Sequence, residues 1–109
     1  MRPLLVDVNH HSETARTRMT VSGEVDSVTA DQLEKAFLDA VRHHQPSHVE
    51  VNIEGVTYLD STGIRALVLC QAGARAAGCR LILVKTPPAV YRVLETTSLL
   101  DHFGVHEAG

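Results

Sequence analysis

The chain contains no apolar stretch approaching the roughly 18 residues that a membrane-spanning helix needs. The apolar segment at the start of the chain ends at the acidic residue Asp7. This segment is too short for the apolar region of a signal peptide. Both absences predict a cytoplasmic protein that does not insert into a membrane.

Clustered basic residues are also missing. Ten Lys and Arg residues are scattered along the chain and are outnumbered by thirteen Asp and Glu residues, for a formal net charge of -3 and a pI near 6.1. Proteins that bind the phosphate backbone of nucleic acids gather positive charge in one segment or on one face. We therefore expect no nucleic-acid partner.

Cysteine is scarce, and neither of the two cysteines is placed like a disulfide partner. Cys70 lies inside an apolar helical pattern, and Cys79 follows Gly78 at the expected start of a strand. Two reduced, structural thiols are the usual state of such residues in a cytoplasmic protein.

The size and composition are those of one small globular domain. The chain has 109 residues, of which 44% are hydrophobic and 21% charged. No repeat or low-complexity linker divides it. We expect residues 1–109 to form a single domain.

Two strands are predicted in the first quarter of the chain. They cover 4–8 and 15–21 and are joined by the polar stretch 9–14, as in a hairpin. Gly23 and Asp26 are predicted to mark a turn.

A helix should follow this turn, capped by Ser27 or Thr29 and ending near His44, before Pro46. Its buried face is defined by apolar residues at helical spacing. These residues are Ala30, Leu33, Phe37, Ala40 and Val41.

The second half alternates strands with helices. A strand is predicted over 49–53, a turn over 55–58 and a helix over 62–77, with Gly78 as its C-terminal stop and a buried strand over 81–84.

Two prolines, Pro87 and Pro88, then open a short helix. Apolar residues that should pack inward follow in this helix and after it: Val90, Val93, Leu94, Leu99, Leu100 and Phe103. The element order β-β-α-β-α-β-α predicts an α/β fold, with a mixed sheet of four to five strands and a layer of helices.

The tetrapeptide Asp60-Ser61-Thr62-Gly63 stands between a strand and a long apolar helix. There the Ser61 oxygen can accept a hydrogen bond from a free backbone N–H, and the helix dipole favours negative charge, including that of a phosphate. The same residue types are also ordinary helix caps. Functional loops of open α/β sheets gather beyond the carboxyl ends of the strands, which is where this tetrapeptide falls.

Known catalytic motifs do not fit the tetrapeptide. An aspartic-protease loop needs Asp-Ser-Gly or Asp-Thr-Gly, whereas an extra residue here separates Asp60 from Gly63. A nucleophile elbow needs G-x-S-x-G, and Leu59 occupies the first glycine position. We therefore expect neither an aspartic-protease site nor a serine-hydrolase site here, and we assign no catalytic residue.

Cofactor and metal sites are not expected either. Gly73 and Gly78 have the spacing of two P-loop glycines, but Cys79 and Arg80 replace the Lys and Ser/Thr, and the segment ends a helix. Histidines that suggest a metal have no carboxylate or cysteine at ligand spacing to complete a site. They are His43, His44, His48, His102 and His106.

Two segments together resemble the STAS-domain family, whose bacterial members include the anti-sigma-factor antagonists. The segments are Thr20-Val21-Ser22-Gly23-Glu24-Val25-Asp26 and Val56-Thr57-Tyr58-Leu59-Asp60-Ser61-Thr62-Gly63-Ile64, and the second is the stronger signal. The resemblance extends from about Leu4 to Phe103 and implies the same α/β architecture.

The resemblance implies a non-enzymatic switch in which Ser61 accepts phosphate from an anti-sigma factor that is itself a serine kinase. A phosphoserine phosphatase would restore the active form. Asp60 would orient Ser61 or contact the kinase, while Thr62 and Gly63 hold the turn into the helix.

In the same family, the turn that contains Glu24 and Asp26 lies on the partner-binding face. Arg65 departs from the family pattern, because many of these antagonists have a small residue there. Arg65 could pair with a phosphate in the first turn of the helix, mark a paralogue with a different partner, or be a solvated surface arginine.

Two alternatives remain. One is a STAS subunit of a lipid-transporting ATP-binding-cassette complex, in which the same loop docks on an ATPase. The other is a phospho-acceptor receiver, suggested by Asp60 after a central strand and by Lys85 before Pro87. The receiver needs paired acidic residues after the first strand, and the chain has none there.

Overall fold

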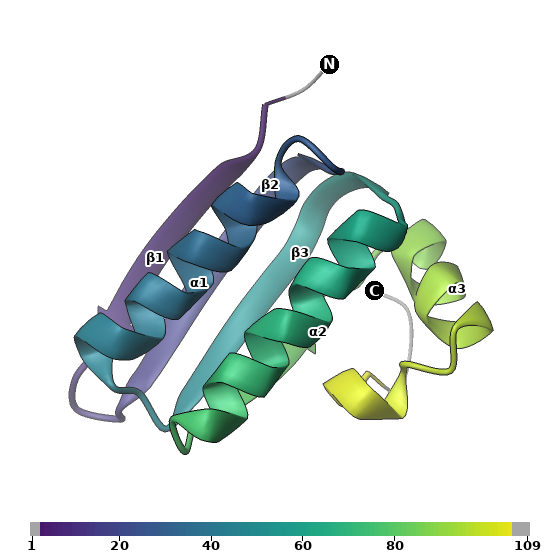
Figure 1. Ribbon diagram of the computed structural model, residues 1–109. Helices are drawn as coiled ribbons and strands as arrows, with labels where there is room; N and C mark the ends of the chain where they lie inside the picture. Colours follow the sequence, from purple (N-terminus) through teal and green to yellow (C-terminus); the bar gives the residue numbers. More distant parts are fainter. Residues whose placement is uncertain (1–2, 106–109) are drawn as a thin grey trace.

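The structure is a computed structural model that describes residues 3–105 (Figure 1). Its elements are β1 (Leu5–His11), β2 (Arg16–Val25), α1 (Ala30–His44), β3 (His48–Leu59), α2 (Ser61–Ala76), β4 (Arg80–Val84), α3 (Pro88–Thr96) and a short 3₁₀ helix, η1 (Asp101–Phe103).

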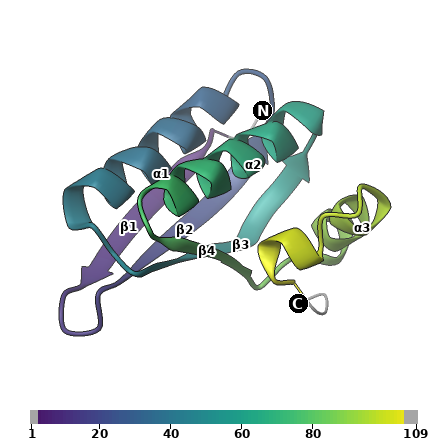
Figure 2. The same cartoon turned by 60° about the horizontal axis from the view of Figure 1, so that its bottom comes forward.

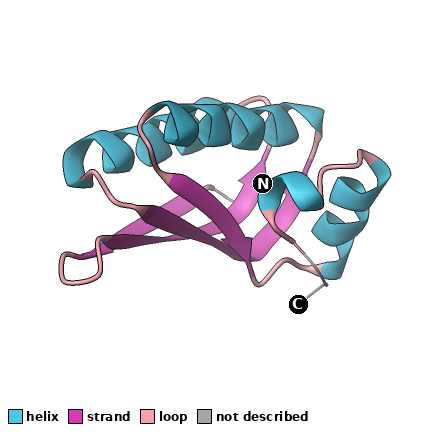
Figure 3. Cartoon of the chain, turned by 90° about the horizontal axis from the view of Figure 1, so that it is seen from below, coloured by secondary structure: helices cyan, strands magenta, loops and turns pink. Residues whose placement is uncertain are grey.

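The four strands form one mixed sheet in the order β1-β2-β3-β4. β1 and β2 are antiparallel, whereas β2, β3 and β4 are parallel. Parallel neighbours need a crossover connection, and α1 and α2 supply the two crossovers. Both helices lie side by side on one face of the sheet (Figures 1 and 3). The predicted α/β class and the mixed sheet with a helical layer are confirmed.

The core lies between this sheet face and the two helices. β2 contributes Met19 and Val21, and α1 contributes Leu33 and Phe37, all at most 1% exposed. All five residues predicted to form the inner face of α1 are buried. Removing these apolar side chains from water supplies the main stabilisation of the fold, at about 25 cal/mol per Å².

β3 is longer than the predicted strand over 49–53. It continues to Leu59, so the predicted turn over 55–58 is wrong. Glu54 and Gly55 are both exposed and interrupt the alternation of buried and exposed residues, while Val56 is buried. The pairing of β2 with β3 shifts register at this point, so the chain stays extended although the alternation of buried and exposed residues is interrupted.

β2 likewise extends past its predicted end at residue 21. Gly23 lies within this strand rather than in a turn, with a φ of +103°. A methyl group at Gly23 would lie 2.2 Å from the carbonyl oxygen of Pro3. The glycine therefore permits a close backbone approach inside the sheet, and the turn begins only after Val25.

The predicted helices are present, but α1 is capped differently. Thr29 occupies the N-cap position without a capping bond from its own side chain. Instead, Asp26 Oδ1 accepts hydrogen bonds from the backbone N–H groups of Val28 and Thr29, at 2.9 and 3.1 Å. Ser27 makes neither bond, because the carboxylate one residue earlier already satisfies these donors.

The C-terminal part of the chain packs as predicted, except that Val93 of α3 is not buried with Val90 and Leu94. Gly78 ends the α2 region with a φ of +72°. α3 buries Val90 and Leu94, and η1 buries Phe103. α3 and η1 lie beyond the β4 side of the sheet (Figure 2).

Both cysteines are free and buried, as expected. Burial, followed by the nearby negative charge of Glu34, raises the pKa of Cys70 to about 12. Burial also raises the pKa of Cys79. High thiol pKa values mean little thiolate and little reactivity.

Candidate functional site

Ser61 is the first residue of α2 and lies where the carboxyl ends of two parallel strands meet. Val25 of β2 pairs with Leu59 of β3 at the end of the ladder. The backbone N–H of Asp60 donates to the carbonyl oxygen of Val25 at 3.4 Å. The loop after β2 and the loop after β3 are thus joined at one edge of the sheet, beyond the carboxyl ends of the two strands.

Asp60, rather than Ser61, caps α2. Asp60 has extended backbone angles, and its Oδ1 accepts a hydrogen bond from the N–H of Gly63 at 3.0 Å. The expectation that the Ser61 oxygen takes this bond is therefore wrong. Because the Asp60 side chain accepts the capping hydrogen bond, the exposed Ser61 does not cap the helix. Within residues 3–105, its hydroxyl has no protein hydrogen-bond partner.

Asp26 and Glu24 occupy two different positions. Asp26 lies in the loop after β2, and hydrogen bonds from the Thr29 and Val28 backbone N–H groups lower the pKa of its carboxyl. Glu24 lies within β2, opposite Tyr58 of β3. The two predicted partner-binding acids are thus close to the Ser61 loop, but one holds the turn that precedes α1 and the other is a strand residue.

Arg65 is exposed on α2, one helical turn after Ser61. Residues four apart on a helix lie on the same face, so Arg65 and Ser61 are neighbours on the surface of α2. It also lines a shallow groove of about 280 Å³ between α1 and α2. The other residues of this groove are Ala30, Asp31, Glu34, Thr62, Ala66 and Leu69.

Two exposed apolar side chains near Ser61 were not predicted from the sequence. Val28, in the loop after β2, is 72% exposed, and Tyr58, near the end of β3, is 48% exposed. Large apolar residues left in water beside a functional loop are typical of contact surfaces. The detectable signal was Val28 itself, an apolar residue in an otherwise polar loop.

The histidines do not assemble a metal centre in the part of the chain that the structure describes. No group of three or more His, Cys, Asp or Glu side chains between residues 3 and 105 is arranged to hold a metal ion. His106 lies outside the described residues. None of the helices in the described range is long and apolar enough to cross a membrane.

Comparison with known proteins places this geometry in a family. A family model described as "Mlab, STAS domain" matches residues 8–103. The anti-sigma-B factor antagonist of Staphylococcus aureus is 31% identical over 87 residues, which cover 80% of each chain.

Solved structures agree with this match. An anti-sigma factor antagonist from Mycobacterium paratuberculosis has a TM-score of 0.76 and 26% identity, over 97% of this chain and 87% of that chain. The Bacillus cell fate determinant SpoIIAA in its phosphorylated form has a TM-score of 0.69 and 17% identity, over 98% and 92% of the two chains. Because the identity to SpoIIAA is only 17%, that similarity shows the shared fold alone. This chain therefore belongs to the STAS-domain family, of the bacterial anti-sigma-factor-antagonist type.

Proposed function

We propose that this protein is a partner-switching antagonist that binds an anti-sigma factor and thereby releases a sigma factor. The anti-sigma factor is also the serine kinase that phosphorylates Ser61, and a phosphatase reverses the modification. The protein itself acts by binding rather than by catalysis. The observation that carries the proposal is the exposed Ser61 hydroxyl at the start of α2, where Asp60 already caps the helix.

The contact surface around Ser61 combines apolar and acidic side chains. Val28 and Tyr58 offer exposed apolar area, and Glu24 lies opposite Tyr58 in the sheet. Apolar residues in the centre of an interface supply much of its binding energy, while charged residues around them set its specificity. We place the unmodified Ser61 hydroxyl within this contact, together with Asp60, Thr62, Gly63, Asp26 and Arg65.

Phosphorylation would change the charge of this surface. A phosphoserine carries about -1.5 to -2 charge at neutral pH. The N-terminus of α2 tolerates that charge in the free protein. In the complex, however, the phosphate would be desolvated next to Asp60, and an unpaired buried charge costs several kcal/mol. The modified protein should therefore release its partner.

Labelling with ATP and the cognate kinase tests the modification. We expect phosphate on the wild-type chain and none on Ser61→Ala. Ser27→Ala is the matched control, because Ser27 is an exposed serine in the neighbouring loop and should remain dispensable. Label that persists on Ser61→Ala and maps to Thr62 would show that the acceptor within the tetrapeptide is misassigned.

Calorimetric titration against the anti-sigma factor tests the switch. Ser61→Ala should keep its affinity, whereas Ser61→Asp should lose at least about tenfold, or roughly 1.4 kcal/mol. Ser27→Asp adds the same charge one loop away and should have a smaller effect. Thermal melts establish that each variant is folded. Equal affinities for Ser61→Ala and Ser61→Asp would contradict the proposal that negative charge at position 61 releases the partner.

The transport-subunit alternative makes a different prediction. A STAS subunit that docks on an ATPase needs no kinase, so no encoded kinase of this type should label Ser61 or Thr62. Its gene should lie beside a permease and a substrate-binding protein rather than beside a small histidine-kinase-like ATPase. Absence of label together with such neighbours would favour this alternative.

A further inference from the structure

Basic side chains that are scattered in the sequence come together on the sheet. In the strand register, His11 of β1 is opposite Arg16 of β2, Arg16 is opposite His48 of β3, and His48 is opposite Arg80 of β4. Side chains directly opposite each other point to the same face of a sheet. These four residues therefore form one row across all four strands.

This row lies on the face that α1 and α2 leave uncovered. Thr17 and Met19 of β2 are fully buried beneath the helices. Because side chains alternate along a strand, Arg16 and Arg18 point to the opposite face. Figure 3 shows both long helices on one side of the sheet only. We call the group His11, Arg16, Arg18, His48 and Arg80 the anion strip.

The arginines of the anion strip keep unused hydrogen-bond donors. Arg16 Nη1 lies 3.6 Å from Glu50 Oε1, and Arg18 Nε lies 3.1 Å from Glu50 Oε2. Each guanidinium has five N–H donors, so one shared carboxylate leaves most of them free. The two side chains are 47% and 63% exposed, which leaves these donors accessible.

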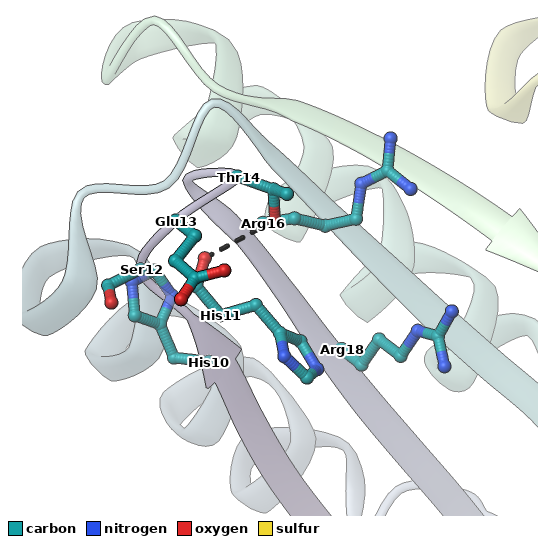
Figure 4. A pocket seen from close by; sticks show the side chains of 7 residues that line it. All are labelled: His10, His11, Ser12, Glu13, Thr14, Arg16 and Arg18. Carbon is teal, nitrogen blue, oxygen red and sulfur yellow. Dashed lines mark hydrogen bonds between the residues drawn. The ribbon is translucent and has the colours of Figure 1, made fainter.

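A hollow of about 540 Å³ adjoins this part of the strip, beside the turn between β1 and β2. Figure 4 shows the side chains of His11, Arg16 and Arg18 around it. The hydroxyls of Ser12 and Thr14 also line the hollow, as do His10 and one carboxylate, Glu13. This volume is typical of a site that binds a small molecule.

We propose that the anion strip binds a small molecule that carries two or more linked phosphate groups. Every permanently charged member of the strip is an arginine, and the planar guanidinium fork matches phosphate oxygens in pairs. Arg16 and Arg18 each offer one such fork beside the hollow, which suits two phosphates better than one.

This site is separate from the Ser61 surface. His48 is the first residue of β3, whereas Ser61 follows the other end of that strand, so the length of a 12-residue strand separates them. The inference does not rest on the proposed function, and either can fail without the other.

Isothermal titration of the full chain with sodium pyrophosphate and with orthophosphate, at low ionic strength, tests the proposal. Pyrophosphate should bind at least tenfold more tightly than orthophosphate. Arg18→Gln should weaken pyrophosphate binding at least tenfold, whereas Glu50→Gln should strengthen it by freeing both guanidinium groups. Arg92→Gln is the matched control, because Arg92 is an exposed arginine on α3 outside the strip, and it should change nothing.

Thermal melts of each variant separate lost binding from lost folding, and Arg18→Lys should recover only part of the affinity because it keeps the charge without the fork. Undetectable pyrophosphate binding, or equal losses in Arg18→Gln and Arg92→Gln, would overturn the proposal. A poly-glutamate peptide that displaces pyrophosphate at lower concentration than orthophosphate does would also overturn it, in favour of an acidic protein partner.

Discussion

Gly63 at the start of α2 lies directly against Val25 at the end of β2. A methyl group at Gly63 would lie 2.7 Å from the carbonyl oxygen of Val25 and 2.9 Å from its Cγ1. It would also lie 2.6 Å from Leu59 Cδ1. The first turn of α2 can therefore approach the sheet only without a side chain at this position, and this approach fixes where Ser61 is presented.

Gly63→Ala should destabilise the protein, because the backbone carbonyl of Val25 cannot move aside easily. Overpacking typically costs about 1–3 kcal/mol, which outweighs the roughly 1 kcal/mol that alanine gains over glycine in a helix. Gly73→Ala in the same helix is the control. Its methyl group would meet only the end of the flexible Leu38 side chain, at 2.4 Å from Cδ2. Thermal melts should show a lower Tm for Gly63→Ala than for Gly73→Ala, and the reverse order would contradict this account.

Asp60 should stabilise α2 through its hydrogen bond to Gly63 rather than through its charge. Loss of such a cap costs about 1 kcal/mol, so Asp60→Ala should lower the free energy of unfolding by that amount. Asp60→Asn keeps an acceptor oxygen and should stay close to the wild type. Urea denaturation of both variants measures the difference. An equal loss in the two variants would mean that the negative charge, and not the cap, stabilises the helix.

The fold was predictable where apolar periodicity was regular. The five buried residues of α1 repeat at helical spacing, and Gly78 stands at the end of α2 as a glycine stop should. The ends of β2 and β3 were not predictable, because Gly23 and Gly55 look like turn residues. Both lie in irregular strand pairing, a tertiary feature that a single segment does not encode.

The candidate site was predictable in place but not in detail. The tetrapeptide does lie beyond the carboxyl end of a parallel strand, beside the loop that contains Asp26. Which residue caps α2 depends on the extended backbone of Asp60, and the sequence offers aspartate, serine and threonine equally. The anion strip depends on strand register, which gathers positions as distant in sequence as His11 and Arg80.

Arg65 should contribute to the stability of the phosphorylated form more than to that of the unmodified form. Arg65 lies one helical turn after Ser61. A charge-assisted bond to phosphate is typically worth about 1.5–3 kcal/mol, less where water screens it. Asp31 and Glu34 of α1 line the same groove as Arg65. Arg65→Gln should therefore lower the Tm of the phosphorylated protein by more than that of the unmodified protein. Equal Tm shifts in both forms would mean that Arg65 contributes to the groove but does not bind the phosphate.

The stacked pair His10 and His44 should make the stability depend on pH. Their ring centroids are 4.4 Å apart, and the edge of His43 contacts His44 at 4.8 Å. His10 Nδ1 is also 2.8 Å from the Thr17 hydroxyl, which holds the ring in the stack. Burial, and then the charges of His10 and His43, lower the pKa of His44.

A histidine whose pKa is lower in the folded state binds protons more readily when unfolded. Its contribution to stability is fully present above the unfolded pKa of about 6.5 and is lost as the pH falls through the folded pKa. The free energy of unfolding should therefore decrease as the pH is lowered below about 6.5. His44→Gln should flatten this slope, whereas His11→Gln, an exposed histidine outside the stack, should retain it. Urea denaturation of both variants and the wild type at several pH values measures the slopes. The same slope in His44→Gln as in the wild type would show that the proton is taken up elsewhere.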